Sequence, residues 1–170
     1  LRCNVCTEYT RNELPIRCTV NPEIGREIDY SHIRPAKKKK RVVIIGGGPA
    51  GMEAALVAST RGHEVLLFER NDKLGGNLIL AAGPPFKADM KRYLNWLSQK
   101  TLHDSNITVR FNIEATVKVV EAEEPDVIIV AVGAEPIIPD IPGVKRDNVV
   151  MAGDVFAGRV HAHMGDAVVV

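Results

Sequence analysis

An α/β fold with a doubly wound parallel sheet is predicted by three features of the 170-residue sequence. Short, wholly apolar runs are typical of strands that are buried on both faces. These runs alternate with segments of helical periodicity, which is the pattern of βαβ units. A glycine-rich turn separates the first of the strands from the first long helix. We therefore expect helices on both faces of one parallel sheet.

Composition excludes several classes of protein. Hydrophobic residues make up 45% of the chain, enough to bury a core, and 22 basic residues balance 21 acidic ones, which argues against a dedicated nucleic-acid binder. No apolar run approaches the roughly 18 residues of a membrane span, and no signal peptide is visible, so we expect a cytoplasmic protein without a membrane anchor. The chain begins at Leu1 and ends on a strand-like run of valines. We expect it to be a segment of a longer protein.

Residues 1–41 form the first predicted unit. They show no sustained helical or strand period, hold all three cysteines and carry a net charge of +5, against −4 for the rest of the chain. We interpret them as an irregular Cys-rich module and linker, because so little apolar pattern needs a covalent or metal link to fold. The basic run at residues 37–41 is interpreted as a solvated approach to the first strand.

Residues 42–150 form the second predicted unit. An apolar strand at 42–45 leads through the glycine turn into a helix at 50–61, and a second strand follows at 65–68. A Gly/Pro-rich excursion spans 72–86. Residues 89–102 then predict a helix with one buried face, with Trp96 in the core beside it. Strands are expected at 107–111 and at 126–131, the latter buried on both sides. The apolar positions of the later helix are Met90, Tyr93, Leu94 and Leu97.

The glycine turn has the spacing of a dinucleotide fingerprint. Gly46, Gly48 and Gly51 give G-x-G-x-x-G between a strand and a helix. In this motif the three glycines allow the tight turn, the approach of a pyrophosphate and the packing of the helix on the strand, respectively. The first helical turn, with Pro49 and Ala50, offers free N–H groups to the phosphates.

An acidic residue follows the second strand, as the fingerprint requires. Glu69 lies 18 residues after Gly51 and is expected to accept hydrogen bonds from a ribose. A carboxylate here favours FAD or NAD over the 2′-phosphate of NADP. For the neighbouring Arg70, contact with the adenosine and a plain surface charge both stay open. A Rossmann-like dinucleotide domain is therefore predicted.

Two further stretches resemble two-dinucleotide flavoprotein reductases and point to FAD. Residues 73–78 resemble their LGGxL stretch, which implies that Gly76, Asn77 and Leu78 lie on the flavin side; a plain Gly-Gly loop is the alternative. Residues 131–136 resemble their ATGxxP turn, which implies cofactor contacts at Ala131 and Gly133. Valine replaces the usual threonine at position 132, so a hydroxyl contact is lost.

The cysteines have the spacing C-x2-C-x11-C, at Cys3, Cys6 and Cys18. Without a secretory signal, three cysteines favour a metal ion or cluster over a disulfide. The spacing leaves zinc, with His32 as a fourth ligand, an iron–sulfur cluster and an unliganded CxxC redox pair all open.

The combined motifs resemble one family from end to end. These motifs are the cysteine pattern, the glycine turn, RGHEV at 61–65, KLGGNL at 73–78 and PPFK at 84–87. Together they resemble the NADH:flavin oxidoreductase family, which is related to 2,4-dienoyl-CoA reductase, trimethylamine dehydrogenase and clostridial enoate and bile-acid reductases. The resemblance implies a longer protein with an FMN-binding barrel, a four-cysteine [4Fe–4S] cluster, an FAD or ADP domain and an NAD(H) domain. Cys3, Cys6 and Cys18 match the second, third and fourth cluster ligands. The first ligand would precede Leu1.

Residues 151–170 form the third predicted unit. The stretch 148–154 resembles either an A-x-G-D flavin contact or this family's hinge, and we favour the hinge. The end of the chain, 168–170, would then be the first strand of an NAD(H) domain. His161 and His163 form an H-x-H that we interpret as exposed hinge rather than as a metal site.

The resemblance implies a relay of electrons from NADH through FAD and [4Fe–4S] to FMN, which reduces an activated C=C bond of an enoate-type small molecule. The FMN barrel and NAD(H) domain would be partners within the same chain, and homo-oligomerisation stays open. We nominate no catalytic residue and expect no turnover from residues 1–170 alone. The alternatives are a structural module that binds ADP or a dinucleotide, and a zinc-stabilised NAD-dependent dehydrogenase.

Overall fold

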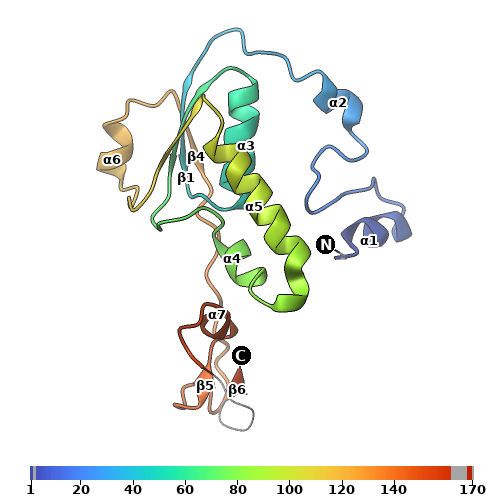
Figure 1. The fold of residues 1–170 in the computed structure, drawn as a ribbon, viewed down its shortest axis with the longest axis vertical. Helices are drawn as coiled ribbons and strands as arrows, with labels where there is room; N and C mark the ends of the chain where they lie inside the picture. Colours follow the sequence, from blue (N-terminus) through green and yellow to red (C-terminus); the bar gives the residue numbers. More distant parts are fainter. Residues whose placement is uncertain (2, 162–167, 170) are drawn as a thin grey trace.

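A four-stranded parallel sheet is the centre of the computed structural model, which describes residues 1, 3–161 and 168–169. The strand order is β3-β2-β1-β4 (Figure 1). The strands are β1 (Arg41–Ile45), β2 (Glu64–Phe68), β3 (Ile107–Arg110) and β4 (Val127–Val130). Each lies within one or two residues of its predicted range, so the predicted parallel sheet is confirmed.

Helices cover both faces of the sheet, as in a doubly wound fold. The long helices α3 (Pro49–Thr60) and α5 (Ala88–Leu102) lie against one face, and the short helix α6 (Val117–Glu121) lies on the other (Figure 1). The chain therefore crosses from β1 to β2 on one side of the sheet and from β3 to β4 on the other. The predicted α/β fold class is correct.

Strand β1 explains why the sheet needs helices on both sides. Its side chains alternate between two hydrophobic clusters, with Val42 and Ile44 facing α3 and Val43 facing α6. Ile44 pairs with Leu67 of β2 and with Ile129 of β4. Burial of a side chain such as Ile44 stabilises the fold by about 1.5–3 kcal/mol. An uninterrupted apolar run is what such a central strand requires.

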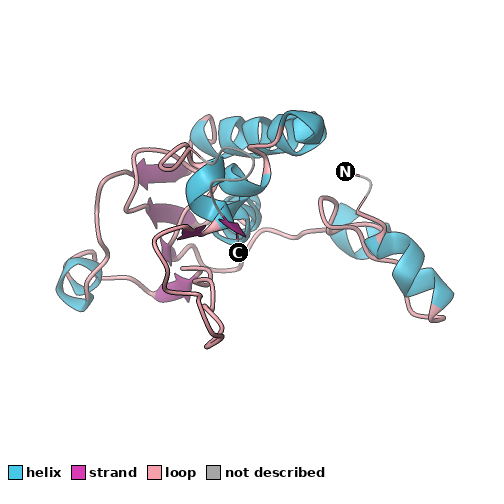
Figure 2. Cartoon of the chain, turned by 90° about the horizontal axis from the view of Figure 1, so that it is seen from below, coloured by secondary structure: helices cyan, strands magenta, loops and turns pink. Residues whose placement is uncertain are grey.

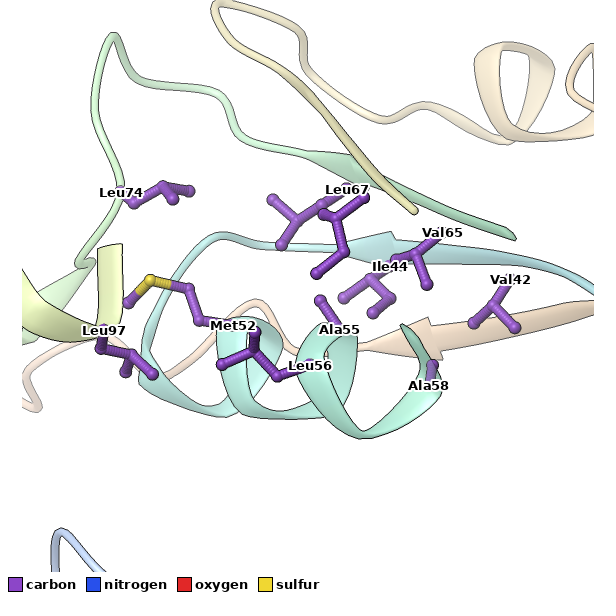
Figure 3. Close-up of a cluster of buried hydrophobic side chains, with 11 residues drawn as sticks. Val42, Ile44, Met52, Ala55, Leu56, Ala58, Val65, Leu67, Leu74 and Leu97 are labelled. Atoms are coloured by element: carbon purple, nitrogen blue, oxygen red, sulfur yellow. The ribbon is translucent and has the colours of Figure 1, made fainter. Parts of the chain in front are cut away.

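The larger cluster lies between the sheet and α3 (Figure 3). Met52, Ala55 and Leu56 come from α3, and the fully buried Leu97 comes from α5. The predicted apolar face of α5 is thus confirmed at Leu97, while Tyr93 and Leu94 are partly buried against the same cluster. Helix α3 starts with Pro49 at its first position and is followed by Gly62, whose φ of +82° lets the chain turn towards β2.

The prediction that β4 is buried on both sides is wrong for this chain. Ile128 is 48% exposed and Val130 is 68% exposed, whereas Val127 and Ile129 pack against the larger cluster. Strand β4 pairs only with β1 in the described part of the chain. On this face α6 covers Val43 and its neighbours, and its cover does not extend over β4. Apolar composition cannot distinguish an edge strand with one open face from a central strand.

The N-terminal segment is less irregular than predicted. It contains two short helices, α1 (Val5–Arg11) and α2 (Glu27–Ser31), in which no residue is buried. Figure 2 shows this segment beside the sheet-containing part, joined to it by an extended linker. Helix α1 is defined by local hydrogen bonds such as Glu8 N–H to the Asn4 carbonyl, 2.9 Å. They need no apolar stripe, which is why periodicity missed it.

The C-terminal segment contains β5 (Val149–Val150), α7 (Ala152–Phe156) and β6 (Val168–Val169). β5 and β6 form a separate two-stranded parallel sheet. The strand predicted at the end of the chain is present at 168–169, and Val170 lies outside the described residues. His163 of the H-x-H also lies outside them, while His161 is exposed.

Trp96 is not a core residue, contrary to prediction. It is 52% exposed and stacks on Tyr93, with ring centroids 5.9 Å apart, while Lys100 lies over its ring. It therefore stacks on the edge residue Tyr93 and is not among the residues that pack against the larger cluster. Among the described residues, no helix is long and apolar enough to cross a bilayer.

Candidate dinucleotide-binding site

Four loops meet at the carboxyl ends of β1, β2 and β4. They are the glycine turn after β1, the Glu69 region after β2, the loop 73–78 that leads into α4 (Asn77–Ala81), and the turn after β4. Because the crossover from β1 to β2 and the crossover from β3 to β4 lie on opposite faces of the sheet, the gap between β1 and β4 is the point where the strand order reverses. Ligands of open α/β sheets bind at such a point. The structure thus brings the predicted site residues to one end of the sheet.

Gly46 and Gly51 lie where no larger residue fits. Gly46 has a φ of +105°, and a Cβ there would lie 2.4 Å from the Ala131 carbonyl oxygen. A Cβ on Gly51 would lie 1.9 Å from the Gly46 carbonyl oxygen. The first glycine therefore lets the turn pass β4, and the third lets α3 start directly against that turn, as the fingerprint predicts.

Gly48 differs from its neighbours because it borders open space. A Cβ built on it meets no atom within 4 Å, apart from its own chain neighbours. It is the N-cap of α3, and within the described chain no side chain caps this end of the helix. Pro49 follows, and Ala50 is exposed. The unbonded N–H groups and the positive end of the helix dipole suit an anion such as a diphosphate.

Glu69 is held in place by protein donors. It is only 5% exposed; its Oε2 accepts the Gly47 N–H at 2.8 Å, and its Oε1 accepts the Asn71 backbone and side-chain N–H groups, both at 2.8 Å. Sequence reasoning missed Gly47 and Asn71. The available signals were a run of three glycines, with Gly47 in the middle, and a hydrogen-bonding Asn two residues after the acid. The adjacent Arg70 is exposed.

The loop 73–78 packs directly on the glycine turn. Gly75 N–H donates to the Gly47 carbonyl at 2.8 Å, and a Cβ on Gly76 would lie 3.2 Å from the Gly48 Cα. Gly76 has a φ of +51°, and α4 begins at the next residue, Asn77. Leu78 N–H donates to the Gly75 carbonyl at 3.1 Å. Gly76 therefore lies beside the open space at Gly48.

The turn after β4 closes the site from the other side. Ala131 N–H donates to the Ile45 carbonyl at 2.8 Å, and Asn77 Nδ2 donates to the Ala134 carbonyl at 3.1 Å. Gly133 has a φ of +78° and no atom within 4 Å of a built Cβ. The Asn77–Ala134 hydrogen bond joins the stretches 73–78 and 131–136, which two separate resemblances assigned to the cofactor site.

The three cysteines are free thiols, with Cys3 exposed and Cys6 and Cys18 half-buried. Cys3 Sγ lies 3.1 Å from Thr19 Oγ1, next in sequence to Cys18. That hydrogen bond, with one from the Val5 backbone, lowers the pKa of the Cys3 thiol. In the described residues, however, no three His, Cys, Asp or Glu side chains gather closely enough to hold a metal ion. The predicted ligands Cys3, Cys6 and Cys18 are therefore not assembled here, and neither is the zinc alternative with His32.

Comparison with known proteins defines the family. Residues 40–167 match the model of the pyridine nucleotide-disulphide oxidoreductase family. The chain belongs to this family. The match starts just before β1, includes the glycine turn, Glu69 and the loop 73–78, and extends past residue 150, where the predicted dinucleotide domain ends.

Several relatives within the pyridine nucleotide-disulphide oxidoreductase family are reductases or oxidases by name. The chain is 45% identical to an NADH oxidase of Thermoanaerobacter brockii and 43% identical to a bilirubin reductase of Mediterraneibacter gnavus, each over 92% of its length. It is 36% identical to a cinnamate reductase of Clostridium sporogenes over 97% of its length. It spans about a quarter of each of these relatives, 24% of their lengths.

A solved structure gives the same result. The chain superposes on a 2-naphthoyl-CoA reductase in complex with 2-naphthoyl-CoA with a TM-score of 0.81 and 36% identity, over 95% of this chain and 24% of that one. Because 95% of this chain is covered, the likeness extends beyond the sheet-containing part. The suspected relationship to flavin-dependent NADH oxidoreductases and enoate reductases is confirmed at the level of the family.

Proposed function

We propose that this chain is the FAD-binding part of a longer NADH-dependent oxidoreductase. One observation carries the proposal: the only glycine of the fingerprint whose side-chain direction is open, among the described residues, is Gly48 at the start of α3. Gly76 lies against it, and Gly133 follows the neighbouring strand. Such a cradle suits the diphosphate of one extended dinucleotide, whose flavin side would lie towards Gly76 and Gly133.

Each predicted residue has a role in this proposal. The free N–H groups at Gly48, Ala50 and Gly51 would bind the diphosphate, and Pro49 presets the first turn of α3. Glu69 Oε2 receives one protein donor and Oε1 receives two, so Oε2 keeps an acceptor site for a ribose hydroxyl.

The remaining contacts would hold the flavin end. Gly76, Asn77 and Leu78 on one side and Ala131 and Gly133 on the other would border it, and Arg70 would lie near the adenosine. Bound FAD supplies the electron-accepting chemistry, and this chain supplies position and electrostatics. None of these residues needs to transfer a proton.

We further propose that Cys3, Cys6 and Cys18 are three ligands of a [4Fe–4S] cluster in the longer protein. Free thiols without a disulfide are the donor set that such a cluster needs. The Cys3–Thr19 contact brings the two ends of the cysteine segment together. The fourth cysteine would precede Leu1, and cluster assembly would order a segment whose thiols are still apart.

In the longer protein the chain would then stand between NADH oxidation and an FMN barrel that reduces an activated C=C bond of an enoate-type substrate. The names cinnamate reductase and 2-naphthoyl-CoA reductase among the relatives support this substrate class. The FMN barrel and an NAD(H) domain, for which 151–170 would form the hinge and first strand, would be its partners.

The FAD assignment is tested by titrating the purified chain with FAD and with ADP in a calorimeter. We expect FAD to bind one-to-one and more tightly than ADP, because residues 74–78 and 131–133 would contact only the flavin half. Equal affinities would instead indicate an ADP-binding structural module. NADH should not bleach the bound flavin rapidly; rapid bleaching would show that residues 1–170 also contain a nicotinamide site and would overturn the assignment of NAD(H) binding to another part of the longer protein.

The cluster assignment is tested with the chain extended upstream by its native residues. Anaerobic reconstitution should give about four irons and four sulfides in the extended chain and fewer in residues 1–170. Cys18→Ala should lose the iron. Equal iron content in all three, or one tightly bound zinc per chain, would reject the cluster.

A further inference from the structure

The carboxylate of Glu69 has little spare capacity to accept hydrogen bonds. Its two oxygens together offer about four acceptor sites. Asn71 fills two of them on Oε1, through its backbone N–H and its side-chain Nδ2, both at 2.8 Å. The Gly47 N–H fills a third, on Oε2, at 2.8 Å. Counting the donors among the described residues, the carboxylate keeps one free site, and that site is on Oε2.

This count matters because a ribose has two neighbouring hydroxyl groups, at its 2′ and 3′ carbons. A carboxylate with a free site on each oxygen can accept hydrogen bonds from both hydroxyls at once. Glu69 has its free site on one oxygen only, and the Asn71 side chain takes the site that a second hydroxyl would need on the other. The number of ribose hydroxyls that Glu69 can bind therefore depends on Asn71.

The segment that carries Glu69 and Asn71 is fixed to the end of β3. The Asn71 carbonyl accepts the Asn112 N–H at 3.1 Å, and the Glu69 carbonyl accepts the Ile113 N–H at 3.1 Å. The Glu69 N–H donates to the Arg110 carbonyl at 3.0 Å. These three backbone hydrogen bonds anchor both residues, so the contact between Asn71 and the carboxylate is already formed without a ligand.

The two oxygens of Glu69 differ in their surroundings. Oε2 lies against the glycine turn, where a Cβ built on Gly47 would be 2.9 Å from it and 2.5 Å from Cδ2 of the buried Leu74. Oε1 lies at the side chain of Asn71, which is exposed. Shortening Asn71 to alanine would consequently open Oε1 to a ligand and leave the bond from Gly47 to Oε2 intact.

We propose that Asn71 determines the ribose specificity of the dinucleotide site. Its side-chain amide occupies the second acceptor position of Glu69, so the carboxylate bonds to one ribose hydroxyl instead of two. This inference rests on the dinucleotide site proposed above and goes beyond it, because it states which nucleotides the site accepts. A nucleoside diphosphate that lacks the other hydroxyl loses no hydrogen bond to Glu69.

The proposal is tested with ADP, 2′-deoxy-ADP and 3′-deoxy-ADP, each titrated into the 170-residue chain in a calorimeter and displaced with FAD. One deoxy analogue should bind about tenfold more weakly than ADP, because it lacks the hydroxyl that bonds to Oε2, and the other should bind within about twofold of ADP. Comparable losses for both analogues, or no loss for either, would overturn the proposal. If neither ADP nor FAD binds, the dinucleotide site itself is rejected instead.

Asn71→Ala tests the blocking role directly. This variant loses Nδ2 but keeps the backbone N–H that bonds to Oε1, so one site on Oε1 becomes free. The analogue that bound like ADP to the unmodified chain should now bind about threefold more weakly than ADP, or weaker still, because the second hydroxyl gains an acceptor. A merely structural role would weaken all three ligands by the same factor, and unchanged affinity ratios would therefore reject the proposal.

Asn95→Ala is the matched control. It is the same substitution at an exposed position of α5, and within the described chain the Asn95 side chain forms no hydrogen bond. The affinity ratios of ADP and its two deoxy analogues should stay those of the unmodified chain. A control that changed these ratios as much as Asn71→Ala would show that the effect does not come from the amide at Oε1 and would overturn the inference.

Discussion

The Gly47 N–H donates to the buried carboxylate of Glu69 at 2.8 Å, so the glycine turn and the end of β2 are joined within the protein itself. A Cβ on Gly47 would lie 2.9 Å from the same carboxylate oxygen and 2.5 Å from Leu74 Cδ2. The acidic residue of the fingerprint therefore has two tasks. It fixes the shape of the turn, and it keeps acceptor capacity for a ligand.

Replacing Glu69 should consequently affect folding as well as binding. Glu69→Ala leaves the Gly47 and Asn71 N–H groups without their acceptor, and we expect a loss of about 1–3 kcal/mol in the free energy of unfolding. FAD affinity should fall as well. Urea unfolding and calorimetric titration measure the two effects separately. Arg70→Ala, which alters the exposed neighbour, should leave stability unchanged; an Ala variant of Glu69 with full stability would contradict the anchoring role.

Gly48 and Gly51 should respond to the same substitution in opposite ways. Gly51→Ala places a Cβ 1.9 Å from the Gly46 carbonyl oxygen, and we expect the strain to cost about 1–3 kcal/mol or to prevent folding. Gly48→Ala meets no atom, and its φ of −73° suits alanine, so stability should stay the same or rise slightly. Only FAD affinity should fall in that variant. Thermal unfolding and FAD titration of both variants check this contrast.

Glu123 should make stability depend on pH. It accepts hydrogen bonds from Arg110 and from Arg41, and these two partners, Arg110 foremost, lower the pKa of its carboxyl. Because the folded state favours the ionised carboxylate, Glu123 stabilises the fold at pH values above the ordinary pKa range of a carboxyl group. This contribution is lost as the pH falls through the pKa of Glu123 in the folded state.

Glu123→Gln should therefore have a lower Tm than the unmodified chain at neutral pH, and the difference should shrink on acidification below the ordinary carboxyl range. Glu121→Gln serves as the control for a general charge effect, because Glu121 is exposed and forms no ion pair within the described residues. A Tm difference that grows on acidification would show that the ion pairs do not act in this direction.

Ile44 and Ile128 compare a closed face of the sheet with an open one. Ile44→Ala removes a fully buried side chain and should cost about 2–5 kcal/mol. Ile128→Ala, on the open face of β4, should cost less than about 1 kcal/mol. Urea unfolding at one temperature provides both values. Similar losses for the two variants would show that the outer face of β4 is covered in solution.

The sequence by itself determined the order and type of the main elements. Apolar runs at 42–45 and 65–68 specify strands because a continuous apolar stretch suits only a buried strand at that length, and the glycine spacing specifies what lies between them. These signals are local, since each depends on residues that are neighbours in the chain. For the same reason the positions of Gly46, Gly48, Gly51 and Glu69 could be assigned without a structure.

Only the tertiary structure decided which surfaces meet. The open face of β4 depends on the strand lying at the edge of the sheet, and the position of Trp96 depends on what α5 packs against. The Gly47–Glu69 and Asn77–Ala134 hydrogen bonds join residues 22 and 57 positions apart. Composition and periodicity describe one segment at a time, whereas such contacts depend on how distant segments pack, and that packing exists only in the folded chain.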